Sequence, residues 1–255
     1  MTPETTATPE PAGGNVFSQL IGVYFSPGEA FKDIGRKSPL LLPMILLALI
    51  VCAGVAITLN RIDLNAMMHK QIDPMVERGW IPQDRAEEMI KQTVANPTSV
   101  LIRGAGQAAV MTLLMTLVMA GVFKLISMLM GAENTFKPIL SVTVFSYLAI
   151  ALVTMVITTI VVYLQSPEEI DMSNPVGSNL AAVLGLFTDK ASLPGFVKAF
   201  ASFIDIFSIW RIALLSIGYA AISKKIKTGT VAMWLGVIYL LFALVMSPLI
   251  AMFMQ

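Results

Sequence analysis

The residues best suited to chemistry are Asp205 and Arg211, which share one apolar stretch, 203–227 (FIDIFSIWRIALLSIGYAAISKKIK). An ionisable side chain at bilayer depth costs roughly 2.5–3.5 kcal/mol on insertion scales, so it marks a candidate functional site. A carboxylate and a guanidinium there suit an ion, a proton or a lipid headgroup, with Arg211 facing the anion.

The two charges do not form an intrahelical pair. On one continuous helix, residues six positions apart point about 120° away from each other and are separated by roughly 9 Å along the axis. A competing interpretation places Asp205 near the outer interface and makes Arg211 an anchor that extends to the headgroups or ties helices together. Uncharged polar residues of the apolar runs remain as partners: Gln107, Thr112, Thr116, Ser141, Ser146, Tyr147, Thr154, Thr158 and Ser208.

The remaining sequence offers no catalytic or metal-binding constellation. His69 has no second histidine or cysteine at ligand spacing, and Cys52 is the single cysteine. No GxSxG, HExxH or P-loop pattern is present. We therefore expect a non-enzymatic protein with no catalytic residues, no metal and no cofactor. The net charge of +1, without a basic tract outside the helix flanks, argues against nucleic acid as a partner.

The elements that carry these residues are membrane helices. Hydrophobic residues make up 56% of the chain and charged residues 13%, whereas soluble domains are nearer a quarter charged. This composition predicts an all-α integral membrane protein. Runs of about 20 apolar residues can cross the bilayer, and we expect five such transmembrane helices: 40–59, 107–130, 138–164, 200–223 and 231–254.

Two further helical regions are expected outside the spans. After a disordered tail over 1–16, Ser26-Pro27-Gly28-Glu29 predicts a capping box, with Ser26 at the N-cap. An N-terminal interfacial helix follows, with Phe25, Phe31 and Ile34 opposed to Lys32, Arg36 and Lys37. The extramembrane segment 60–106 has apolar residues at helical spacing on both sides of Pro82, which predicts a helical hairpin between spans 1 and 2.

Lysines and arginines favour one orientation by their placement. The two sides hold equal numbers, but those on the N-terminal side lie in short segments close to span ends. Such residues dominate the positive-inside rule. We expect the N-terminus in the cytoplasm and the C-terminus outside, in a bacterial inner membrane.

The segment Phe25–Ile34 (FSPGEAFKDI) and a proline-flanked first span resemble the opening of the Yip domain family, five-span relatives of the Ypt/Rab-interacting membrane proteins. The stretch Asp205–Trp210, with Leu214, Leu215 and Gly218, is similar to the fourth span of that family. The resemblance implies that Trp210 and Gly218 join Asp205 and Arg211 in the candidate intramembrane polar site. The resemblance covers about 17–255 and implies five helices, a cytoplasmic N-terminus and no enzymatic activity. Eukaryotic members act in vesicle trafficking through Rab GTPases, whereas the short N-terminal region and enlarged first loop look more like the bacterial branch.

These observations favour a non-enzymatic membrane protein that acts through lipids or partner proteins, in membrane organisation or a trafficking-like role. Its partners would be membrane lipids, other membrane proteins or a second copy of the chain. The alternative is a small channel or transporter with a polar path near Asp205 and Arg211.

Overall fold

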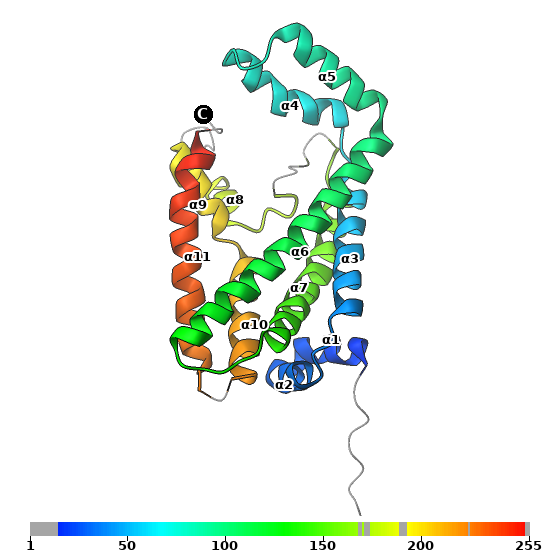
Figure 1. The fold of residues 1–255 in the computed structure, drawn as a ribbon. Coiled ribbons are helices and arrows are strands. Elements are labelled where there is room, and N and C mark those ends of the chain that lie inside the picture. The colour runs from blue at the N-terminus through cyan, green and yellow to red at the C-terminus, as the bar shows by residue number, and fades with distance from the viewer. Residues whose placement is uncertain (1–14, 168–169, 171–173, 189–192, 224, 253–255) are drawn as a thin grey trace, which may run out of the picture.

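The computed structural model describes residues 15–167, 170, 174–188, 193–223 and 225–252, and these residues are largely helical (Figure 1). The one β-type pairing within these ranges is an isolated bridge between Asn179 and Asp205, so the all-α prediction is confirmed. The helices are α1 (Val16–Phe25), α2 (Pro27–Lys37), α3 (Leu41–Leu59), α4 (Leu64–Glu77), α5 (Gln83–Ala95), α6 (Pro97–Leu129), α7 (Phe136–Leu164), α8 (Leu180–Leu184), α9 (Gly195–Phe203), α10 (Ile206–Ala221) and α11 (Thr228–Ala251).

Four helices in the described part of the chain are long and apolar enough to cross a membrane: α3, α6, α7 and α11. They carry many exposed large apolar side chains, as expected where lipid rather than water is the solvent. The prediction of an integral membrane protein is therefore confirmed. The five-helix count remains a prediction, because α10 is shorter than a span and follows α9 after a break.

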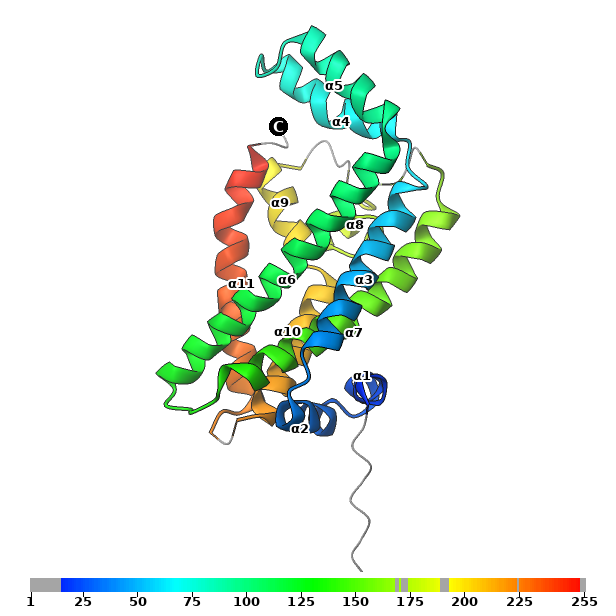
Figure 2. The same cartoon turned by 45° about the vertical axis from the view of Figure 1, so that its right-hand side comes forward.

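The region between the first two spans differs in extent from the prediction. The second long helix, α6, begins at Pro97 rather than near 107, because proline is well suited to the first helical position. Helices α4 and α5 precede it as a hairpin with a small core of its own, formed by Ile72, Ala86 and Ile90. Figure 2 shows this hairpin beyond the end of the bundle where α3 ends and α6 begins.

The N-terminal helices α1 and α2 lie at the opposite end of the bundle (Figure 1). Most of the predicted tail, 1–14, lies outside the described residues, whereas Asn15 caps α1 through a bond from the Ser18 amide. The expected capping box of α2 is wrong, although Ser26 and Pro27 occupy the predicted positions. The Ser26 amide already donates to the Gly22 carbonyl, so Glu29 pairs with Lys32 at 2.7 Å instead.

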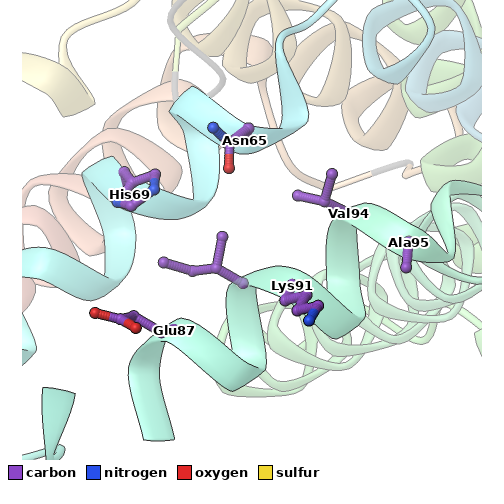
Figure 3. Close-up of a pocket in the computed structure, with 7 residues that line it drawn as sticks. Asn65, His69, Glu87, Lys91, Val94 and Ala95 are labelled. Atoms are coloured by element: carbon purple, nitrogen blue, oxygen red, sulfur yellow. The ribbon is translucent and has the colours of Figure 1, made fainter. Parts of the chain in front are cut away.

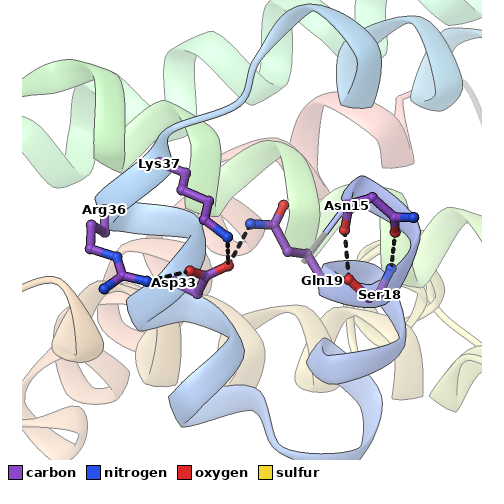
Figure 4. Close-up of polar contacts among 6 residues, drawn as sticks. All are labelled: Asn15, Ser18, Gln19, Asp33, Arg36 and Lys37. Carbon is purple, nitrogen blue, oxygen red and sulfur yellow. Dashed lines mark hydrogen bonds and ion pairs between the residues drawn. The ribbon is translucent and has the colours of Figure 1, made fainter. Parts of the chain in front are cut away.

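The apolar face of α2 is buried in protein, not turned toward lipid. Phe31 and Ile34 are fully buried, and α2 packs against α7 and α10, whereas Phe25 on α1 is 83% exposed. A polar cluster joins α1 to α2 (Figure 4): the Asp33 carboxylate accepts from Gln19 at 2.8 Å and from Arg36 and Lys37 at 3.0 Å each.

The main core lies at this same end, where α2, α6, α7 and α10 meet. The rings of Phe123 and Tyr219 stack with centroids 3.7 Å apart. The Thr143 hydroxyl donates to the Ile139 carbonyl, so the Tyr219 hydroxyl, 2.7 Å from it, is the donor of their bond. At Gly218 an added Cβ would lie 2.4 Å from Val142 Cγ1, which shows how closely α10 approaches α7.

The helix predicted over 200–223 is two helices. Helix α9 begins earlier, at Gly195, and ends at Phe203; Ile204 and Asp205 are extended, and α10 starts at Ile206. The physical reason is the side chain of Asp205, which accepts hydrogen bonds from the amides of Phe207 and Ser208. Aspartate favours this N-cap role over a helix interior, and apolar composition alone does not reveal the break.

Candidate functional site

Asp205 holds the break between α9 and α10 in place. Besides capping α10, its Oδ2 accepts a hydrogen bond from the Ser178 hydroxyl. The two backbone carbonyls freed by the break are also satisfied: the Leu180 amide donates to Ile204 O and the Tyr239 hydroxyl to Phe203 O, each at 2.8 Å. Irregular backbone at membrane depth requires such internal partners. The contacts of Asp205 are thus those of a structural residue.

Arg211 lies in the second turn of α10, in a different environment. Its guanidinium carbon is 5.1 Å from the ring centroid of Tyr147, a cation–π distance. Its Nε is buried and has no hydrogen-bond partner. Among the described residues, none of the ion pairs involves Arg211. The positive charge is therefore held by an aromatic face and not by an acid.

A cavity of about 880 Å³ surrounds this arginine. Helices α3, α6, α7, α10 and α11 all contribute to its walls, together with Pro175 from the segment after α7. The lining is mostly apolar, and Arg211 is the one charged side chain among the described lining residues. Uncharged polar groups complete it: Thr58, Thr112, Tyr147, Thr154, Thr158, Ser208 and Tyr239. Its volume and character are those of a small-molecule or cofactor site.

The walls that α6 and α11 contribute to the cavity include exposed apolar side chains. On α6, Met111, Met115 and Val118 line the cavity and are also 46%, 49% and 58% exposed. On α11, Phe242 lines it and is 50% exposed. Both helices are long apolar spans, so the surface they share faces hydrocarbon.

Trp210 and Gly218 do not line this cavity. The Trp210 ring packs on Tyr24 with centroids 6.2 Å apart, and the Tyr24 hydroxyl donates to the Ala149 carbonyl at 2.6 Å. Gly218 lies in the close α10–α7 contact. Of the four candidate residues, the structure therefore brings only Arg211 into the cavity, whereas Asp205 caps α10 outside the cavity lining.

Sequence reasoning found part of the cavity wall. Tyr147, Thr154, Thr158, Thr112 and Ser208 were named as polar partners, and all five line the cavity. Tyr239 and Pro175 were missed. A mid-helix tyrosine in the last span was the available signal, because a buried tyrosine hydroxyl needs a partner.

A second, smaller hollow lies on the hairpin (Figure 3). It has a volume of about 460 Å³ between α4 and α5, and Figure 3 shows His69 on one helix with Glu87 and Lys91 on the other. His69 Nδ1 lies 3.2 Å from Asp73 Oδ1 within α4. No group of three histidine, cysteine or acidic side chains able to hold a metal occurs in the part of the chain that the structure describes.

Comparison with known proteins places the chain in a family. A family model described as the Yip1 domain matches residues 21–247, nearly the whole sequence. No curated protein and no solved structure matched the chain. The match includes α10 and every residue that lines the cavity. The chain therefore belongs to the Yip1 domain family of integral membrane proteins.

Proposed function

We propose that this protein acts without catalysis, by binding a membrane lipid in the side-opening cavity. The observation that carries the proposal is the position of Met111, Met115 and Val118, which line the cavity and are about half exposed on a long apolar span. In this arrangement the cavity would open between α6 and α11 toward the bilayer. A molecule already dissolved in the bilayer can enter such a cavity without crossing water. Lipid binding of this kind suits a role in membrane organisation.

The test is to fill the cavity mouth with a bulky side chain. Met115→Trp places an indole at the opening, and we expect the purified protein to lose most of the lipid that wild type retains after detergent exchange. Lipid per protein, measured by native mass spectrometry and by extraction, is the readout.

The chain supplies a matched control on the same helix. Leu114 is 49% exposed, as Met115 is, but it does not line the cavity. Leu114→Trp should retain as much lipid as wild type. Equal retention in both variants would contradict the proposal, because the retained lipid would then coat the outer surface.

The alternative is a small channel or transporter, and the position of Arg211 in an intramembrane cavity favours it. Flux or conductance in liposomes that vanished in Arg211→Leu or Asp205→Asn would support this alternative over lipid binding. Partner proteins, including a second copy of the chain, would contact the outer faces of the same helices. The orientation with a cytoplasmic N-terminus and the bacterial inner membrane are part of the same proposal.

A further inference from the structure

We propose that the bound lipid carries an anionic headgroup of the phosphate class, and that Arg211 contacts its negative charge. This inference rests on the proposed function, since it names the class of lipid in the same cavity. The argument comes from the charge, the unsatisfied polar groups and the opening of the cavity.

The charge of Arg211 calls for an anion. A guanidinium in a low-dielectric site is expensive unless it is paired and hydrogen-bonded. Tyr147 covers one face of the guanidinium, and the Nε donor of Arg211 is buried without a partner. The planar fork of arginine matches a phosphate group with parallel N–H donors. An anion in the cavity would supply what the described protein groups do not.

A second unsatisfied group shares the cavity. Thr154 lines it from α7, and its Oγ1 is buried without a hydrogen-bond partner. A threonine hydroxyl can donate to a phosphate oxygen. Thr154 is thus a second polar group in the cavity wall that a purely apolar lipid would leave unsatisfied.

The opening selects a lipid over a soluble anion. In the proposed arrangement the lipid enters through the α6–α11 mouth, whose wall residues Met111, Met115 and Phe242 are apolar. A free phosphate ion would have to leave water and cross hydrocarbon to enter by this route. An acyl chain can lie along this wall while its headgroup reaches inward to Arg211.

The chain contains a matched control for the arginine. Arg61, which follows α3, also stacks on a tyrosine, with its guanidinium carbon 5.0 Å from the Tyr163 ring centroid, and its Nε is likewise buried without a partner. Arg61 does not line the cavity. A general effect of removing an arginine from the protein should therefore appear in both variants, and a headgroup effect only at Arg211.

The experiment titrates delipidated protein in neutral detergent with three probes: phosphatidylglycerol, diacylglycerol with the same acyl chains, and inorganic phosphate. Affinity is measured by native mass spectrometry and by the shift in Tm. We expect phosphatidylglycerol to bind wild type about tenfold or more tightly than Arg211→Gln, the scale of a charge-assisted hydrogen bond. Diacylglycerol should bind both equally, Arg61→Gln should match wild type, and inorganic phosphate should have no effect.

Equal phosphatidylglycerol affinity in wild type and Arg211→Gln would overturn the inference, as would an equal loss in Arg61→Gln or Arg211-dependent binding of inorganic phosphate alone. These results leave lipid binding itself intact, whereas an unchanged lipid content in Met115→Trp removes the proposed function. If Arg211→Gln does not fold, wild type is compared with Met115→Trp. Wild type must then prefer phosphatidylglycerol over diacylglycerol, and Met115→Trp must lack this preference.

Discussion

The two ends of α10 differ in how the protein uses them. At the end near α2, Gly218 and Tyr219 lie in a core where the helix almost touches α7. Toward the other end, Ser208 and Arg211 line a cavity of about 880 Å³. One helix thus combines close packing, which leaves no space, with a polar group facing open space. The apolar composition is similar along the helix, so the difference lies in what the neighbouring helices present.

The two ends of α10 should therefore differ in what they contribute to stability and to binding. The packed end fixes the position of α10 through close contacts with α2 and α7, which are sensitive to any change in volume. The cavity end can then hold an unsatisfied arginine without disordering the bundle. Changes at the packed end should therefore affect stability, and changes in the cavity should affect binding.

The largest expected effect is at Gly218. A leucine there would force its Cβ to within 2.4 Å of Val142 Cγ1 and 3.1 Å of the Phe31 ring, so Gly218→Leu should lower stability by about 3 kcal/mol or more. Thermal unfolding in detergent measures the loss. Gly121→Leu on α6 is the control, because nothing lies within 4 Å of an added Cβ there. A Tm equal to that of the control would show that the packed end is not tight.

A medium effect is expected at the break. Asp205→Ala removes the N-cap of α10 and the bond from Ser178, and it should cost about 1–2 kcal/mol. Asp205→Asn keeps a side-chain oxygen for the Phe207 and Ser208 amides and should lie near wild type in Tm. An equal loss in both variants would mean that the charge of Asp205, and not its cap, stabilises the break.

The smallest effect is a pH dependence at the packed end. Burial raises the pKa of Asp33, but hydrogen bonds from Gln19, Lys37 and Arg36 outweigh it, so the pKa lies below its usual value. The stability from this cluster is present above the unfolded-state pKa of about 3.9 and is lost as the pH falls through the lower folded-state value. The loss should stay below about 1 kcal/mol for such a partly exposed cluster.

Comparing the Tm of wild type and Asp33→Asn from neutral pH down to about pH 3 isolates this contribution, because other acids titrate in both proteins. The difference between them should shrink as the pH falls. A difference that stays constant would show that the Asp33 carboxylate gains nothing from its three donors.

Sequence patterns predicted the membrane class because the bilayer imposes a minimum length on apolar helices. Helices α3 and α7 begin within two residues of their predicted starts, and 60–106 was expected to contain two helices, as α4 and α5 do. The same length criterion predicted a single helix over 200–223. It averages hydropathy along the run, so it does not detect that Asp205 caps a new helix. The burial of Phe31 in protein could not be predicted from the sequence either. An amphipathic helix has the same sequence pattern whether its apolar face contacts lipid or another helix such as α10.

The sequence by itself determined that the chain is an all-α membrane protein, because that follows from hydropathy and from the length of the apolar runs. The tertiary structure alone decided that Arg211, and not Asp205, lines the cavity. The cavity is enclosed by α3, α6, α7, α10 and α11, whereas at Gly218 α10 packs closely on α7. Such a space depends on the relative positions of five helices, which no local pattern along one helix encodes.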